Sequence, residues 1–241
     1  MNTKFLTTAA VLAISLSTGA QASLVARTGG MVYDTVNNIT WAADANLFQT
    51  QAASNANLVS EIIAANGGVI HDTPNVYDNG TYTLTTADFD TTTGRMTWWG
   101  AQAWANNLTL GGVTGWSLPS TPVESFGYNV TSSQMGDLFY NQLGVSANNL
   151  IAMSTNPNYN LFTNVQIFSY WSGSEYAPDP DGAWLFDTLN GYQNNTNKTN
   201  QLYAWAVRPG EVAAVPVPGA FWLFGSAMVG LMGLKRRGSI G

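Results

Sequence analysis

The chain has 241 residues, a formal net charge of −6 and no cysteine. Charged residues make up only 9% of it, whereas aromatic residues make up 12% and include nine tryptophans. This composition is the opposite of a disordered one, so we expect a folded domain with a sizeable core. The lack of cysteine excludes disulfides, thiolate metal sites and a cysteine nucleophile. The acidic charge disfavours nucleic acid as a partner.

The first residues predict a secretory signal peptide. Lys4 precedes an apolar stretch over residues 5–16, and Ala20 and Ala22 fit the small-x-small rule for signal peptidase. We therefore expect signal peptidase to remove residues 1–22 after Ala22 and the protein to be exported. The alternative is that this segment stays in place as an N-terminal membrane anchor.

The first half of the domain predicts two short strands, then mostly helix. Residues 31–34 and 39–41 read as strands around a turn at 37–38. Apolar residues recur at helical spacing over residues 46–65, which predicts one helix. Residues 69–90 are rich in Thr, Asn and Asp, and we expect a loop that contains a hairpin.

Two more helices are expected before the chain turns to strands. Thr97 is a suitable N-cap for a helix that ends at Leu108. Another helix is expected to start at Ser132 or Ser133 and to run through Leu143.

The last third of the domain predicts antiparallel hairpins. Strands are expected over residues 168–174, 183–189 and 202–208, because apolar residues alternate there. A turn at 178–182 and a polar segment over 190–200 separate them. Helices first and strands later favour an α+β fold for residues 23–210.

Candidate chemistry in this domain is sparse. Glu175, Asp179 and Asp181 bring three carboxylates to one turn, which makes calcium the one candidate metal, with a plain surface turn as the alternative. The single histidine, His71, lies in a polar stretch, and no Gly-x-Ser-x-Gly elbow is present. No carboxylate pair stands out as the pair that glycoside hydrolysis needs. We therefore expect no catalysis and no other cofactor.

The tryptophans are expected to serve mainly as core residues, since large aromatic side chains dominate core burial. Trp99 and Trp104 fall partly off the inward stripe of the helix over residues 97–108. They are therefore the candidates for stacking against a sugar ring.

The C-terminal segment, residues 211–241, predicts a sorting signal. Its features are, in order, Val215, Pro216, Val217 and Pro218, an uncharged apolar run over residues 219–234, and the basic residues Lys235, Arg236 and Arg237. The apolar run is near the lower limit for a transmembrane helix, and the basic residues are expected to stay cytoplasmic. The alternative is a buried helix of the domain.

This tail resembles the PEP-CTERM sorting signal of Gram-negative bacteria. The resemblance implies recognition by the membrane enzyme exosortase and cleavage near the proline motif. The protein is then anchored in the membrane before processing and is found at the cell surface or outside the cell afterwards.

Several short motifs follow one another between residues 30 and 209. They are Gly30-Met31-Val32-Tyr33-Asp34, Met96-Thr97-Trp98, Gly115-Trp116-Ser117-Leu118-Pro119-Ser120, Tyr170-Trp171-Ser172-Gly173-Ser174-Glu175 and Tyr203-Ala204-Trp205-Ala206-Val207-Arg208. Together they resemble the Lcl-type domain, named for the C-terminal domain of a bacterial collagen-like adhesin. The resemblance implies a C-type-lectin-like fold, with helices packed on a twisted, largely antiparallel sheet, and a role in surface adhesion and glycan binding.

We therefore hypothesise an exported surface or matrix protein without catalysis. Its expected partners are exosortase, signal peptidase and an exopolysaccharide or neutral glycan, because a sulfated polymer needs a basic face that this domain lacks. The alternatives are a carbohydrate-active hydrolase and a structural matrix protein without a ligand.

Overall fold

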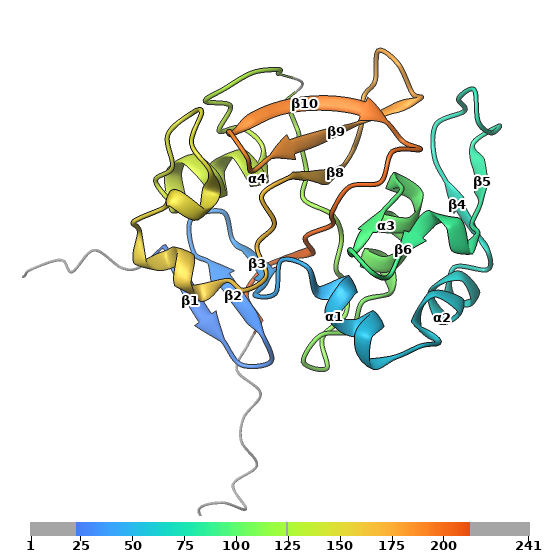
Figure 1. The fold of residues 1–241 in the computed structure, drawn as a ribbon, viewed down its shortest axis with the longest axis horizontal. Helices are drawn as coiled ribbons and strands as arrows, with labels where there is room; N and C mark the ends of the chain where they lie inside the picture. The colour runs from blue at the N-terminus through green and yellow to red at the C-terminus, as the bar shows by residue number, and fades with distance from the viewer. Residues whose placement is uncertain (1–22, 124, 213–241) are drawn as a thin grey trace, which may run out of the picture.

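The computed structural model describes residues 23–123 and 125–212 (Figure 1). The expected signal peptide with Ala20 and Ala22, and the expected sorting tail from Val215 to Arg237, lie outside the described residues. Within the described ranges, no helix is both long and apolar enough to cross a membrane.

The described chain combines short helices with antiparallel strands. The strands are β1 (Leu24–Arg27), β2 (Met31–Asp34), β3 (Ile39–Ala42), β4 (Val69–His71), β5 (Thr81–Thr83), β6 (Phe89–Asp90), β7 (Arg95–Met96), β8 (Ser169–Glu175), β9 (Gly182–Asp187), β10 (Tyr192–Asn197) and β11 (Val207–Pro209). The α-helices are α1 (Leu47–Ser54), α2 (Leu58–Ala65), α3 (Trp98–Asn107) and α4 (Gln134–Asp137).

The strands form two main sheets and two small hairpins. One main sheet has the order β1-β2-β3-β11, and the other has the order β10-β9-β8. The hairpins are β4-β5 and β6-β7, and all of these pairings are antiparallel. Figure 1 shows the three-stranded sheet at the top and α1, α2, α3 and the β4-β5 hairpin at the right. The predicted α+β class with largely antiparallel strands is confirmed.

Local hydrogen bonds explain where the first elements begin and end. The buried Asp34 carboxylate accepts the backbone amides of Val36 and Asn37, which fixes the predicted turn between β2 and β3. The single helix expected over residues 46–65 is instead two helices. The chain breaks between them because the Asn55 side chain accepts the amide of Asn57 and makes a local turn in place of helical bonds.

The later helices begin at the predicted caps. Thr97 Oγ1 accepts the Gly100 amide at 3.2 Å, and Ser133 Oγ accepts the Gly136 amide at 3.0 Å. After α4 the chain continues as a wider π-helical turn over Leu138–Gln142. The helix expected up to Leu143 is therefore confirmed in position, but most of it is not α-helical.

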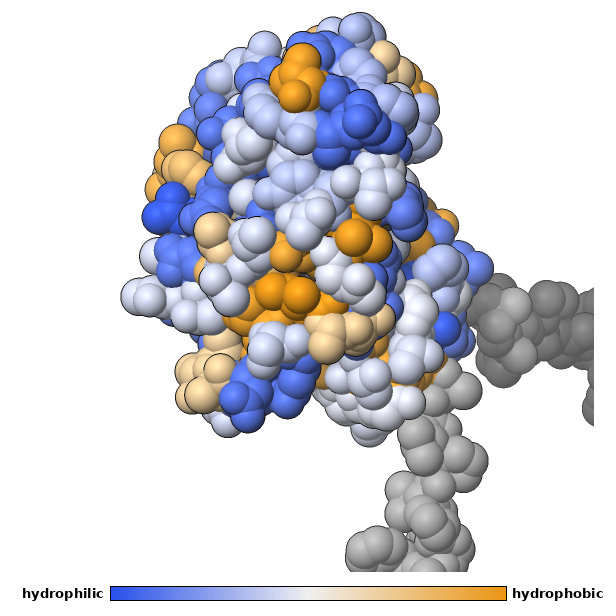
Figure 2. Space-filling model, turned by 90° about the vertical axis from the view of Figure 1, so that its right-hand side faces the viewer, coloured by the Kyte–Doolittle hydropathy of each residue, from blue (hydrophilic) through white to orange (hydrophobic). Residues whose placement is uncertain are grey.

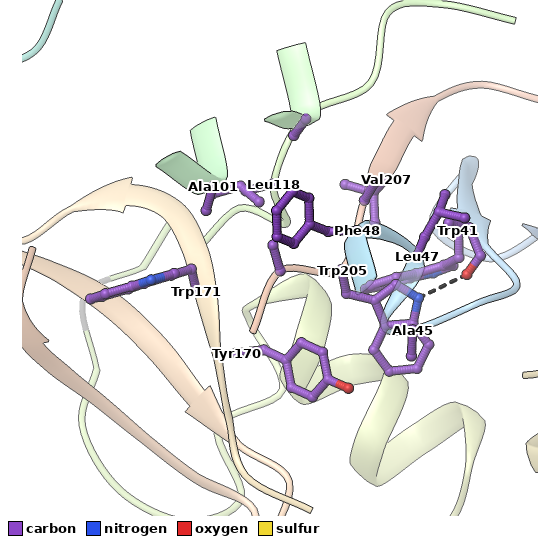
Figure 3. Close-up of a cluster of buried hydrophobic side chains, with 14 of the residues drawn as sticks. Trp41, Ala45, Leu47, Phe48, Ala101, Leu118, Tyr170, Trp171, Trp205 and Val207 are labelled. Carbon is purple, nitrogen blue, oxygen red and sulfur yellow. Dashed lines mark hydrogen bonds between the residues drawn. The ribbon is translucent and has the colours of Figure 1, made fainter. Parts of the chain in front are cut away.

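A tryptophan-rich core joins the two main sheets to α1 and α3 (Figure 3). Trp205 packs edge-on against Trp41 and Phe162, with ring centroids 5.5 and 5.0 Å apart. Its indole nitrogen donates to the Ala42 carbonyl at 2.8 Å, the bond drawn in Figure 3. All eight tryptophans of the described residues are at most 3% exposed, which confirms that these residues build the core.

The surface beside α2 is the most apolar part of the side shown in Figure 2. This side lies at the right in Figure 1, and apolar surface gathers in its lower half. Leu58, Val59 and Ile63 of α2 are half-buried there.

Two strands and one small hairpin lie where the sequence predicts none. β1 pairs with β2, and β10 lies in the segment over residues 190–200, for which the sequence predicts a polar turn. The unpredicted hairpin is β6-β7. Conversely, the strand expected over residues 202–208 is regular only in β11, while Leu202 and Tyr203 make single bridges to β7 and β8.

Candidate functional site

A groove of about 410 Å³ lies along one face of the β8-β9-β10 sheet. Its polar lining comes largely from carboxamide side chains, and its floor includes Leu185 and Leu202. The carboxamide residues are Asn190, Asn194, Asn195, Asn200 and Gln201.

Strand register explains why these side chains meet. Residues directly opposite each other on neighbouring antiparallel strands share a face of the sheet. Ser169 of β8, Asp187 of β9 and Tyr192 of β10 form one such row. Leu185 and Asn194 belong to the next row of the same face. The chain then leaves β10 and folds back, so that residues 200–202 complete the groove.

Among the described residues, Asp187 is the only one that lines the groove with a carboxyl group. Burial raises the pKa of this carboxyl above its ordinary value, while the Leu189 amide that donates to it at 2.9 Å acts in the opposite direction. The charged form is therefore less favoured here than in water. An acidic ligand would meet a carboxyl group in this groove rather than a cation.

One aromatic ring of the groove lining is exposed and has a cation packed against it. Phe168 lines it and is 42% exposed. The Arg95 guanidinium lies 5.5 Å from the Phe168 ring and 5.9 Å from the Tyr203 ring. The groove thus combines an accessible aromatic ring with amides that both donate and accept hydrogen bonds, a combination suited to a neutral polar ligand.

The groove lies inside a recognised domain. The family model of the Lcl C-terminal domain matches residues 30–208. The chain belongs to the Lcl C-terminal domain family. None of the curated proteins and none of the solved structures in the comparisons matches it. Membership of this family suggests an extracellular or surface protein.

The tryptophans considered for sugar stacking are buried in this Lcl C-terminal domain. Trp99 is fully buried, stacks on Tyr82 with ring centroids 3.8 Å apart, and donates from its indole nitrogen to Asp72. Trp104 is 2% exposed and donates to Gln51 at 2.8 Å. Neither ring presents a face to a ligand, so this prediction is wrong. Helix α3 is covered by the rest of the domain on more than one face. The sequence prediction assumed a single buried face and therefore left Trp99 and Trp104 exposed.

The candidate calcium residues do not converge on one point. Glu175 contacts the Lys198 ammonium, and Asp181 accepts the Val76 amide at 2.8 Å. Asp179 accepts the Asp181 amide in its own turn. Among the described residues, no group of three or more His, Cys, Asp or Glu side chains is arranged to hold a metal ion. Each of the three carboxylates instead has a hydrogen-bond partner in the protein, and those of Glu175 and Asp181 include amides of distant residues.

Sequence reasoning missed the most buried charge of the domain. The Lys198 side chain is fully buried, and its Nζ lies 2.6 Å from Asp72 Oδ2 and 2.9 Å from Glu175 Oε2. Glu175 therefore has Lys198 as its ion-pair partner. The sequence around Lys198 is polar and does not predict that its side chain is buried. Its partner Asp72 is 126 residues away, so the ion pair could not be predicted from local sequence either.

Proposed function

We propose that this protein binds a neutral glycan or exopolysaccharide without catalysis, through the groove on the β8-β9-β10 sheet. The observation that carries the proposal is the row of carboxamides from β10 and residues 200–201 beside the exposed ring of Phe168. Planar amides can pair with neighbouring sugar hydroxyls, because each amide offers a donor and an acceptor on one plane. The ring of Phe168 can cover the apolar face of a sugar.

The charge distribution supports a neutral ligand over a polyanion. Asp187 lies in the groove, and the whole chain carries a formal charge of −6. Arg95, which packs against the Phe168 and Tyr203 rings, does not line the groove. A sulfated polymer would need a broad basic face, which such a surface does not provide.

Binding is favoured over hydrolysis by the lining of the groove. Glycoside hydrolysis by the usual mechanisms uses two carboxyl groups that flank the scissile bond. Asp187 has no second carboxyl beside it among the described residues of the groove lining. The hydrolase alternative therefore lacks its acid–base pair at this place.

We further propose the cellular context that the two ends of the chain indicate. Residues 1–22 serve as a signal peptide, and residues 211–241 serve as a PEP-CTERM tail that exosortase processes. The domain between them adopts a C-type-lectin-like arrangement. Export places the groove outside the cell, at the surface or in the matrix, where polysaccharide is abundant.

The test is a glycan array probed with the exported protein, with and without added calcium. We expect saturable binding to at least one neutral glycan, unchanged by calcium. Phe168→Ala and Asn194→Ala should each weaken it at least tenfold, while Asn149→Ala, at an exposed site outside the groove, should not. Binding that survives both groove substitutions would refute the assignment of the groove.

A further inference from the structure

Lys198 sits in a closed arrangement of two carboxyl groups and two indoles. The side chains of Lys198 and Asp72 are both 0% exposed, and Glu175 is 25% exposed. The ammonium lies 4.7 Å from the centre of the Trp98 ring and 5.8 Å from that of Trp99. An amine and two carboxyl groups are thus held in contact in a place from which water is largely excluded.

The Asp72 carboxyl is held in a fixed orientation by neutral donors. Its Oδ2 accepts the Trp99 indole N–H at 2.9 Å and the Asn75 amide at 3.2 Å, in addition to Lys198. Its Oδ1 is buried and has no hydrogen-bond partner among the described residues. The donors on Oδ2 draw electron density from the carboxyl group, which makes its carbon more open to attack by a nucleophile.

Amide formation requires the Lys198 amine and the Asp72 carboxyl group in their neutral forms. Charges buried away from water are costly even when they are paired. If a proton passes from the Lys198 ammonium to the Asp72 carboxylate, a neutral amine and a neutral acid remain in contact. These are the reactants of amide formation, and they are already at the short distances that an intramolecular reaction requires.

We propose that Lys198 and Asp72 join through an isopeptide bond, with Glu175 as the proton carrier. After the first proton transfer, the Nζ lone pair adds to Asp72 Cγ and forms the C–N bond. Glu175 takes a second proton from Nζ and passes it to the Asp72 hydroxyl, which leaves as water when the C–O bond breaks. Glu175 ends in the state in which it began, and the reaction needs no oxidant or other reactant.

The bond would fasten a peripheral segment, here called the strap, to the chain directly after β10. We define the strap as residues 69–83, which comprise β4, β5 and the loop between them. The strap already contacts the sheet where the Thr73 and Val76 amides donate to Glu175 and Asp181. An amide between residues 72 and 198 would make this contact covalent in a chain that has no cysteine. The inference does not depend on glycan binding.

Tryptic mapping of the full-length exported protein tests the bond directly. Trypsin cuts after Arg27, Arg95 and Lys198 in an unlinked chain and releases residues 28–95 and 96–198 separately. In the linked protein Lys198 is no longer cleaved. Residues 28–95 then stay joined to the peptide that begins at residue 96 and continues past 198, with the mass of one water less than the sum. We expect this branched species from the denatured wild-type protein.

Variants separate the chemistry from folding. Lys198→Arg keeps the positive charge and should abolish the branched species, and Glu175→Gln should abolish or strongly slow its formation. Asp179→Asn, an exposed carboxyl of the neighbouring turn, should leave it intact. Circular dichroism verifies that each variant is folded. The proposal would be overturned by a folded wild-type protein that shows no loss of one water from the mass of the processed chain and that releases a free peptide 96–198, whatever the variants do.

Discussion

A substitution of Trp99 distinguishes a role in core packing from a role in ligand binding. Its ring stacks on Tyr82 at 3.8 Å with an angle of 3°, and its N–H donates to the buried Asp72 carboxylate. Trp99→Phe keeps an aromatic ring for Tyr82 but removes the donor and part of the indole. We therefore expect a loss of stability and no loss of glycan affinity.

The size of the loss follows from the contacts. The hydrogen bond from Trp99 to Asp72 contributes about 1.5–3 kcal/mol when Asp72 is a free carboxylate and about 0.5–1.5 kcal/mol when Asp72 is joined to Lys198 as a neutral amide. Replacing the indole with the smaller phenyl ring leaves unfilled space in the core, which adds about 1 kcal/mol. We expect a total loss of about 1.5–4 kcal/mol, a large part of the roughly 5–15 kcal/mol that stabilises a domain.

Urea unfolding followed by circular dichroism measures this loss, and the glycan array measures affinity on the same samples. Phe168→Ala is the matched comparison, since Phe168 is 42% exposed. It should lower stability by less than about 1 kcal/mol and lower affinity strongly. A stability loss below about 1 kcal/mol for Trp99→Phe, or a selective loss of its affinity, would refute the reasoning.

Three further substitutions test local features of the fold. The raised pKa of Asp187 means that the folded state binds the proton more tightly than the unfolded state, so stability falls as pH rises from the ordinary carboxyl range to the folded-state pKa. Asp187→Asn should remove this part of the pH dependence and stabilise the domain at pH 7, which thermal unfolding across pH 3–8 checks. Thr97→Ala removes the N-cap of α3 and the bond to Asp88 and should cost about 1–2 kcal/mol in urea unfolding. Gly100→Ala should destabilise the domain in the same assay, because the added Cβ would lie 2.6 Å from the Asp88 carbonyl oxygen. Alanine is otherwise the better helix former. A gain in stability would therefore contradict the close approach of α3 to Asp88.

The helix starts could be predicted from their capping residues, whereas the polar strand β10 could not be predicted. The caps Thr97 and Ser133 are short polar side chains that bond three residues ahead, so sequence alone locates them. β10 has the sequence Tyr-Gln-Asn-Asn-Thr-Asn and shows no apolar alternation. Its groove face is polar, so the periodicity that identifies a half-buried strand is missing.

The candidate site was only partly accessible to sequence reasoning. The abundance of Asn over residues 190–200 is visible in the sequence. The particular residues were not foreseeable, because the row of Ser169, Asp187 and Tyr192 depends on strand register. Trp99 was misassigned for a similar reason, since Tyr82 of the strap covers it from a distant part of the chain.

Hydrogen–deuterium exchange with a bound glycan tests the central claim most directly. The full chain would be compared with and without a saturating amount of the best neutral glycan from the array. The groove predicts protection of backbone amides in residues 185–202 and near Phe168, with little change in the strap. Protection confined to residues outside the β8-β9-β10 sheet would contradict the placement of the binding site.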